Sequence, residues 1–259
     1  MSLHLYSTVF PEPLSPTAFQ ELLSRLPPAL QQKVSAYRRW QDAYGSLFGK
    51  LLLKKALLQA GFSPDLTGLR TTSYGRPYLE GYGEPYPDGG DGSYPDGNDR
   101  PYPDGGQGNM GRMDFNISHS GNRVVCMLST QGRVGIDLEE TGDIAMDDFQ
   151  SQFTAAEWAA ITGAAIPLKA FYHYWTAKES LIKADGRGLQ IPLDTLETVG
   201  QPGILVNGRH ALVNDRHVLV NGRQWHIRNL PIFPVYACHI ACEHPIGPVT
   251  TEEIGPDRF

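Results

Sequence analysis

Two long helical patterns, each lying among strand-like segments, restrict the fold of this chain more than any other feature. The first runs from Asp42 to Ala60 and is followed by Gly61, and the second begins at Pro167 and ends before Gly186. Glycine commonly follows the last residue of a helix because it adopts left-handed backbone angles without strain. Strand-like segments surround both helices: residues 3–10, 123–129, 133–139, 224–230 and 235–241. We therefore predict an α+β fold with two similar halves, each with strands around one long helix.

Local signals inside these segments predict caps and a close contact. Ser15 is a predicted helix N-cap, and Thr154 with Glu157 forms a predicted capping box. Gly45 and Gly49 lie inside the first long helix, where each costs about 1 kcal/mol relative to alanine. We therefore expect another element to pack very close to the helix backbone at these two glycines.

Hairpins are predicted at two places in the chain. The strands at 123–129 and 133–139 are separated by the turn-like residues 130–132, which predicts that they pair with each other. The motif LVNGR, or LVNDR, begins at Leu205 and recurs every seven residues. Because Asn-Gly is a strong signal for a tight turn, we expect an expanded β-hairpin region there.

A segment from about residue 80 to 109 is expected to be a flexible surface insertion. It repeats YPDG with a period of eight and has no large aliphatic side chain, so it cannot bury enough apolar surface to offset ordering. Calcium binding is an alternative, but the clustered ligand spacing of a calcium loop is missing. Seven of the 28 acidic residues and one of the 22 basic residues of the chain lie in this segment, so the remainder has equal numbers of acidic and basic residues. That balance gives no indication of nucleic-acid binding, and no apolar run is long enough to span a membrane.

The stretch VGIDLE at residues 134–139 places two acids on one side of a strand. Asp137 and Glu139 are two positions apart, so their side chains share a face and lie about 6.5 Å apart. One interpretation is a solvated strand face. The other is a site for a hard cation such as Mg²⁺, which prefers carboxylate oxygens, water and phosphate as ligands.

The second long helix supplies a third acid. Trp175, Glu179 and Lys183 recur every four residues, so they line one side of the helix. An exposed Glu–Lys pair is the simpler interpretation. Aromatic residues cover nearly every direction of this helix, however, so most of it should be buried and Glu179 needs a partner. Three carboxylates and a lysine that converge suggest phosphoryl chemistry.

Cysteine and histidine usage gives weaker signals. Cys238, His239, Cys242 and His244 lie close in sequence, but His239 faces away from both cysteines in a strand, so we interpret them as core residues rather than a zinc site. The three cysteines show no disulfide framework, and the N-terminus lacks the pattern of a signal peptide. We expect a cytoplasmic protein.

Four motifs in order carry a resemblance to the 4′-phosphopantetheinyl transferases. VGIDLE is followed about forty residues later by FYHYWTAKESLIKADGRGL, and DFNISHSGNRVVCML and YGRP lie upstream. The chain is most similar to the larger, monomeric class of the surfactin-synthetase-activating type. This resemblance is nearly continuous over residues 114–196 and patchy before Tyr74, and the two repeat segments lie outside it.

The resemblance implies roles for individual residues. In that family the acids matching Asp137, Glu139 and Glu179 surround a Mg²⁺ ion on the pyrophosphate of coenzyme A, and the lysine matching Lys183 contacts the same phosphates. Residues matching two further motifs bind coenzyme A: Ser118 and His119 at the phosphate, and Gly75, Arg76 and Pro77 against the adenine. Glu179 is then the expected general base, acting directly or through a water molecule, and Lys183 stabilises charge on the leaving oxygen.

One position departs from the family pattern. The family often has an arginine that holds the 3′-phosphate of coenzyme A at the position of Gly45. Lys50 is the replacement that we favour, because a flexible lysine side chain about one and a half turns further along the helix has the reach. Four other basic residues remain alternatives: Lys33, Arg38, Arg39 and Lys54.

The resemblance also implies an architecture and an activity. We expect subdomains at residues 1–121 and 122–259, related by a pseudo-twofold axis, with coenzyme A in the cleft between them. The expected enzyme is a monomer that transfers 4′-phosphopantetheine from coenzyme A to a serine of an apo acyl or peptidyl carrier protein, releasing adenosine 3′,5′-bisphosphate. The alternatives are a non-catalytic relative that binds coenzyme A or a carrier protein, and a metal-dependent phosphohydrolase.

Overall fold

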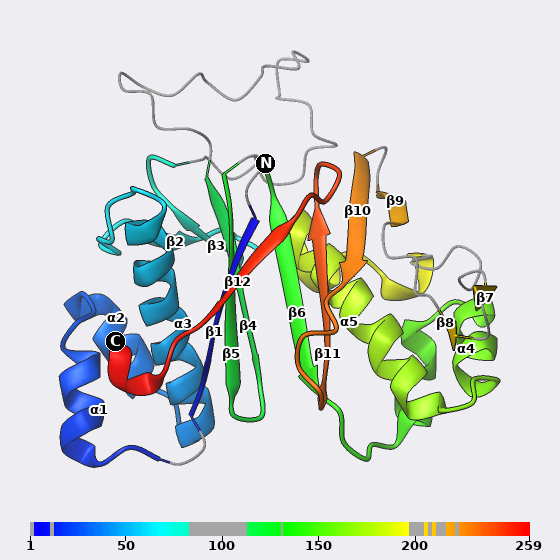
Figure 1. Ribbon diagram of the computed structural model, residues 1–259, viewed down its shortest axis with the longest axis horizontal. Coiled ribbons are helices and arrows are strands. Elements are labelled where there is room, and N and C mark those ends of the chain that lie inside the picture. The colour runs from blue at the N-terminus through cyan, green and yellow to red at the C-terminus, as the bar shows by residue number, and fades with distance from the viewer. Residues whose placement is uncertain are drawn as a thin grey trace. The chain divides into compact units, whose positions relative to one another are not determined.

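The chain consists of two compact units in a computed structural model, which describes residues 3–10, 13–82, 113–130, 132–196, 205–206, 209–210, 216–220 and 223–259. Unit 1 comprises residues 1–132 and 247–259, and unit 2 comprises residues 133–246. Each unit contains a four-stranded sheet and one long helix that packs against it. The combination of helices and sheets agrees with the α+β fold predicted from the sequence (Figure 1).

Unit 1 is built on a sheet with the strand order β12-β1-β5-β4. Strand β1 pairs in parallel with β12 and antiparallel with β5, and β4 pairs antiparallel with β5. The strands of unit 1 are β1 (Leu3–Val9), β2 (Leu69–Thr71), β3 (Pro77–Leu79), β4 (Asp114–Ser120), β5 (Arg123–Ser129) and β12 (Val249–Glu253). Its helices are α1 (Pro16–Leu23), α2 (Pro28–Ser35), α3 (Trp40–Gln59) and the short η4 (Pro256–Arg258).

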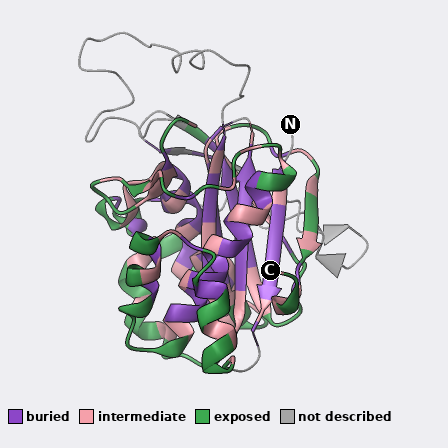
Figure 2. Cartoon of the chain, turned by 90° about the vertical axis from the view of Figure 1, so that its left-hand side faces the viewer, coloured by how far each residue is buried: buried purple, intermediate pink, exposed green. Residues whose placement is uncertain are grey.

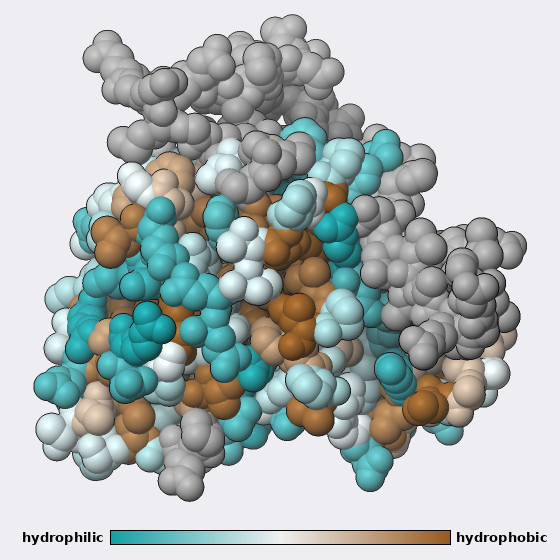
Figure 3. Space-filling model, viewed as in Figure 1, coloured by the Kyte–Doolittle hydropathy of each residue, from teal (hydrophilic) through white to brown (hydrophobic). Residues whose placement is uncertain are grey.

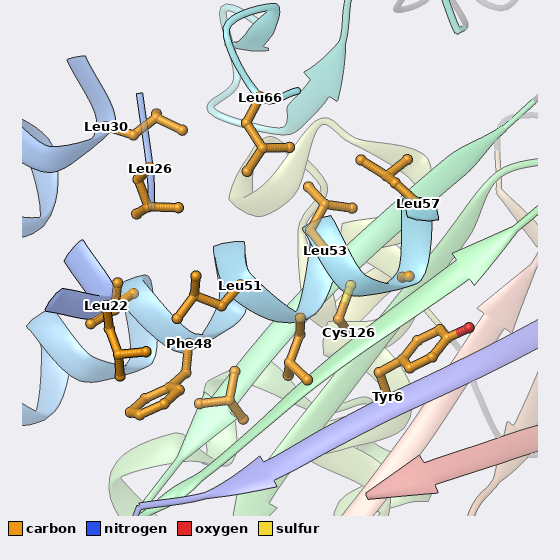
Figure 4. Close-up of a cluster of buried hydrophobic side chains, with 14 of the residues drawn as sticks. Tyr6, Leu22, Leu26, Leu30, Phe48, Leu51, Leu53, Leu57, Leu66 and Cys126 are labelled. Carbon is orange, nitrogen blue, oxygen red and sulfur yellow. The ribbon is translucent and has the colours of Figure 1, made fainter. Parts of the chain in front are cut away.

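The core of unit 1 lies where α3 meets this sheet. Phe48, Leu53 and Leu57 of α3 are fully buried, and Cys126 of β5 is buried with them. Leucines from α1, α2 and the connecting loops complete the same cluster (Figure 4). The strands and the inner side of α3 are largely buried, whereas the outer helical surfaces are exposed (Figure 2).

Unit 2 repeats this plan with an antiparallel sheet in the order β6-β11-β10-β9. Its strands are β6 (Val134–Glu140), β7 (Leu205–Val206), β8 (Arg209–His210), β9 (Arg216–Val220), β10 (Arg223–Asn229) and β11 (Tyr236–Cys242). Its helices are η1 (Met146–Gln152), α4 (Ala155–Thr162), α5 (Pro167–Asp185), η2 (Gly188–Gln190) and η3 (Leu193–Thr195). Helix α5 packs on β6, β11 and β10, with Leu181 and Trp225 fully buried in the core.

Several predicted local features are confirmed. Ser15 caps α1, Thr154 and Glu157 form a capping box at α4, and α5 ends at Gly186 with a φ of 96°. The β7–β8 and β9–β10 pairs are antiparallel hairpins within the LVNGR region. The remainder of that repeat region lies outside the described residues.

The predicted pairing of strands 123–129 and 133–139 is wrong. Strand β5 pairs with β1 on one side and β4 on the other, so it has no edge left for β6. The true hairpin joins β4 to β5 through Gly121 and Asn122, and Gly121 has a φ of 55°. A boundary at residue 121 would cut this hairpin, and β12 returns the chain to unit 1, so the observed division differs from the expected one.

Only the first residues of the expected insertion are described. Tyr82 packs edge-on against Phe62 at 5.4 Å between ring centres, so it belongs to the body of unit 1. The backbone N–H of Met113 donates to the carbonyl of Tyr82 over 3.3 Å. Residues 83–112 lie outside the described part of the chain.

The described surface mixes hydrophobic and hydrophilic residues. Leu189 is 75% exposed and Ile166 is 61% exposed, and Figure 3 shows hydrophobic residues next to hydrophilic ones on one face. Among the described residues, no helix has both the length and the apolar character that a membrane span requires.

Candidate active site

Strand β6 places its two acids on the side that faces α5. A Cβ atom at Gly135 would lie 2.0 Å from the carbonyl oxygen of Ser180 and 2.4 Å from the nitrogen of Ala184, so the α5 backbone touches β6 there. Side chains alternate along a strand, so Asp137 and Glu139 share the side of Gly135. The sequence prediction that the two acids share one face is therefore consistent with how α5 packs.

Helix α5 brings a lysine onto the first of these acids. The Nζ of Lys183 lies 2.5 Å from Oδ1 of Asp137, whose side chain is only 3% exposed, whereas that of Lys183 is 29% exposed. Glu179 lies one helical turn before Lys183 and is partly buried. Asp137 of β6 and Lys183 of α5 thus meet across the helix–sheet contact of unit 2.

Electrostatic effects show that Glu179 belongs to the same cluster. Burial, and then the negative charge of Asp137, raise the pKa of Glu179 to about 7, and Glu139 adds to the rise while Lys183 opposes it. Burial opposes the charge of Lys183, but Asp137, Glu179 and Glu139 outweigh it and raise the pKa of Lys183. The three acids and the lysine therefore act on one another.

The donor atoms of this cluster suit a hard divalent cation. The three acids offer only carboxylate oxygens, which are the ligands that Mg²⁺ prefers, and their mutual repulsion favours an added positive charge. In the described part of the chain, no three histidine, cysteine or carboxylate side chains are already spaced as a formed metal site. Lys183 instead holds Asp137, so the carboxylates fit the ion in chemistry without being arranged around one.

Three of the four residues predicted to be core residues, Cys238, His239 and Cys242 of β11, are buried in unit 2, whereas His244 lies beyond β11 and is exposed. Cys238 and Cys242 are buried thiols. His239 pairs with Asp137 in the sheet register, and its Nδ1 lies 2.7 Å from the hydroxyl of Thr176. That hydroxyl already donates to the carbonyl of Tyr172, so His239 is the donor in this contact. His239 therefore orients against α5 and away from the two thiols.

In unit 1, the Gly-Arg-Pro residues form a turn that is fixed to β4. The N–H of Gly75 donates to the carbonyl of Thr72 over 2.9 Å, and Gly75 has a φ of 84°. The guanidinium of Arg76 donates to both carboxylate oxygens of Asp114, at 3.0 and 2.8 Å. Arg76 was expected beside coenzyme A, but its side chain is largely buried in this ion pair, which fixes the turn that ends at Pro77.

His119 lies at the other end of β4 and packs on α3. A Cβ atom at Gly45 would lie 2.7 Å from ring atoms of His119, and one at Gly49 would lie 2.8 Å from Ile117. The close contact predicted at the two glycines is therefore confirmed. A side chain at position 45 would require the ring of His119 to move. His119 is exposed and Ser118 is buried beside it.

Lys50 lies against its own helix. Its Nζ donates to the hydroxyl of Ser46 over 2.6 Å, and burial, with a smaller contribution from the charge of Lys33, lowers the pKa of Lys50 to about 8. Lys54 reaches elsewhere, since its Nζ donates to the carbonyl of Arg25. A phosphate bound between Lys33 and Lys50 would relieve the repulsion between their ammonium groups. The assignment of Lys50 to the 3′-phosphate stays a prediction.

A buried ion pair on α5, next to Glu179 in sequence, was not predicted from the sequence. Lys178 is fully buried, and its Nζ lies 2.6 Å from Oε2 of Glu157 and donates to the carbonyls of Leu193 and Leu196. Glu157 also accepts the N–H of Thr154 in the capping box. Lys178 thus ties α5 to the start of α4 and to η3. A buried lysine needs a partner as a buried glutamate does, but nothing in the sequence indicates that Glu157 is the partner of Lys178.

Glu179→Gln is expected to stabilise the metal-free protein at alkaline pH. The pKa of Glu179 is about 7 in the folded chain, whereas an ordinary glutamate has a pKa of 4.5, so folding stability falls as pH rises between these values. Glutamine removes this penalty, which we estimate at about 2–3 kcal/mol at pH 8 and near zero at pH 4. Urea unfolding with a chelator at both pH values measures the difference, and exposed Glu140→Gln is the matched control. An equal effect of Glu179→Gln at both pH values would contradict the electrostatic explanation.

A comparison with known protein families gives a match to the region that contains Asp137, Glu139 and Glu179. The family model of the 4′-phosphopantetheinyl transferase superfamily matches residues 133–230, which include β6 and α5. The 4′-phosphopantetheinyl transferase Sfp of Bacillus subtilis is 26% identical over 254 residues, covering 95% of each chain. The transferase gsp of Aneurinibacillus migulanus is 30% identical over 188 residues, covering 71% of this chain and 66% of the relative. The L-aminoadipate-semialdehyde dehydrogenase-phosphopantetheinyl transferase of Xenopus laevis is 28% identical over 193 residues, covering 70% of this chain and 56% of the relative.

Proposed function

Because the chain belongs to the 4′-phosphopantetheinyl transferase superfamily, we propose that it transfers the 4′-phosphopantetheine group of coenzyme A to a serine hydroxyl of an apo carrier protein. One observation supports this most strongly. Asp137 of β6 contacts Lys183 of α5, and Glu179 interacts electrostatically with both, inside the region that the family model matches. This is the combination of acids and a cation that phosphoryl transfer requires.

Asp137, Glu139 and Glu179 would hold a Mg²⁺ ion in this proposal. The ion would neutralise negative charge on the diphosphate of coenzyme A and on the phosphorus centre as it reacts. The position of Asp137 and Glu139 on a strand that α5 covers keeps their carboxylates in fixed directions. Lys183, one turn from Glu179 on α5, offers an ammonium group to the same phosphates.

Glu179 is the proposed general base. It lies one helical turn from Lys183 on α5 and is partly buried, so its carboxylate is placed beside the groups that would surround the reacting phosphorus. It accepts the proton of the serine hydroxyl as the serine oxygen bonds to phosphorus. The bond from phosphorus to the bridging diphosphate oxygen breaks, and adenosine 3′,5′-bisphosphate leaves with the electron pair. Lys183 stabilises the charge that develops on the leaving oxygen.

Residues of unit 1 would bind the adenosine end of coenzyme A. The turn Gly75–Pro77 offers backbone groups and an apolar ring, and exposed His119 offers an imidazole for phosphate. Asp114 and His119 are five residues apart on β4, or about 16 Å, so the guanidinium of Arg76 and the ring of His119 do not share one phosphate. Contact of coenzyme A with both units, the pseudo-twofold relation of the subdomains, the monomeric state and the cytoplasmic location remain predictions.

The test of the proposed function is mass spectrometry of an apo carrier protein. The carrier is incubated with this protein, Mg²⁺ and coenzyme A, and a gain of one phosphopantetheine group supports the transferase. Free phosphopantetheine with an unmodified carrier would indicate a phosphohydrolase. Binding of coenzyme A with neither product, across acyl and peptidyl carriers, would indicate a non-catalytic relative.

Lys50→Ala is expected to weaken coenzyme A binding by about tenfold to a hundredfold, because a charge-assisted contact to phosphate contributes about 1.5–3 kcal/mol. Calorimetry with 3′-dephospho-coenzyme A, which lacks that phosphate, should show almost no change. Lys55→Ala is the matched control on the same helix. Equal losses for both ligands would mean that Lys50 only supports α3, and Lys33, Arg38 and Arg39 would become the next variants to test.

A further inference from the structure

The contact between Lys183 and Asp137 places an ammonium group at a predicted metal ligand. The Nζ of Lys183 lies 2.5 Å from Oδ1 of Asp137, so the two groups form a charge-assisted hydrogen bond. Asp137 is 3% exposed, so water screens this attraction weakly. The ion pair is therefore a strong local interaction that any other cation at this oxygen has to replace.

A divalent cation and the ammonium group of Lys183 cannot both contact Oδ1 of Asp137 from the same side. A metal–oxygen distance for Mg²⁺ is about 2.1 Å, which places the ion inside the space that Nζ occupies next to Oδ1. Three carboxylates face one ammonium group in the cluster, however, so negative charge remains that a dication neutralises better than the lysine does. The remaining negative charge of the cluster thus favours binding of a dication. Lys183 opposes that binding because its ammonium group contacts Oδ1 of Asp137.

We propose that Lys183 serves as a placeholder cation on Asp137 in the metal-free protein, and that a divalent cation binds by displacing its ammonium group. This inference rests on the proposed function for the identity of the metal ligands. Lys183 is partly exposed, and its long stem has the freedom to swing away from Asp137. A diphosphate bound nearby would accept the displaced ammonium group, so metal and coenzyme A binding support each other.

The test measures Mn²⁺ binding without coenzyme A, by water-proton relaxation of the full-length protein. Lys183→Met removes the competing ammonium group, and we expect Mn²⁺ to bind about tenfold more tightly. Lys183→Arg keeps the charge and offers a two-pronged contact to Asp137 that is harder to displace, so we expect weaker Mn²⁺ binding than in the parent protein. The rise of the melting temperature on adding Mn²⁺ should follow the same order.

Two controls separate displacement from other causes. Lys169→Met removes a positive charge from an exposed position of α5 and should leave Mn²⁺ affinity unchanged, whereas a general charge effect would raise it. Unchanged or weaker Mn²⁺ binding in Lys183→Met would overturn the proposal, as would tighter binding in Lys183→Arg. The carrier-protein assay on the parent protein does not depend on these Mn²⁺ measurements. Failure of the proposed transferase activity and failure of the proposed displacement of Lys183 are therefore distinguishable.

Discussion

Lys178→Met is expected to destabilise unit 2 by about 3–5 kcal/mol, because it leaves a buried carboxylate without its counter-ion. Glu157 is 2% exposed and lies 2.6 Å from the Nζ of Lys178, and two backbone carbonyls lose the same donor. Methionine has a similar length, so the loss reflects charge and hydrogen bonding rather than a cavity. Urea unfolding followed by tryptophan fluorescence measures the effect, since three of the four tryptophans, Trp158, Trp175 and Trp225, lie in unit 2.

The double variant Lys178→Met with Glu157→Gln is the control. Glutamine is neutral and still accepts the N–H of Thr154, because Gln also serves at this position of a capping box. The double variant should recover most of the lost stability, since it removes the buried unpaired charge. A loss below about 1 kcal/mol in Lys178→Met would show that water reaches Glu157, against the burial seen here.

Gly135→Ala is expected to lower both stability and activity strongly. The new Cβ atom would lie 2.0 Å from the carbonyl oxygen of Ser180, and backbone atoms on both sides must shift by more than about 1 Å to restore ordinary contact distances. Overpacking of this kind costs about 3 kcal/mol. Because α5 carries Glu179 and Lys183, a shift of this size should also reduce turnover by about a hundredfold in the protein that still folds.

Gly142→Ala is the matched control for this prediction, because a Cβ atom there meets nothing within 4 Å. Thermal unfolding and the carrier-protein assay are applied to both variants. Parent-like activity in Gly135→Ala would mean that α5 does not need this close approach to position its acid and lysine.

Features set by short stretches of sequence were predictable. Alternation in β6 gave the shared face of Asp137 and Glu139, and the spacing in α5 gave the shared side of Glu179 and Lys183. The two glycines of α3 pointed to close packing, and the structure supplies the neighbours as His119 and Ile117. In each case neighbouring residues alone fix the geometry, through strand and helix periodicity or the missing Cβ atom.

Features set by contacts distant in sequence were not predictable. The turn-like residues between β5 and β6 suggested a hairpin, but pairing of β5 with β1 and β4 excludes it. The pairing of β12 with β1 joins residues more than 240 positions apart. Asp114 as the partner of Arg76, and Glu157 as that of Lys178, depend on the same tertiary contacts. Burial of a charged side chain indicates that a partner exists, and only the fold identifies it.

The most direct test of the role of Glu179 measures the Glu179→Gln variant in two ways on one preparation. Mass spectrometry follows transfer of phosphopantetheine to an apo carrier protein, and calorimetry follows binding of coenzyme A with Mg²⁺. Since the substitution keeps the shape of the side chain and removes its base, we expect no detectable transfer and a coenzyme A affinity within about tenfold of the parent protein. Transfer at the parent rate would contradict the assignment of Glu179, and with it the catalytic role of the cluster on β6 and α5.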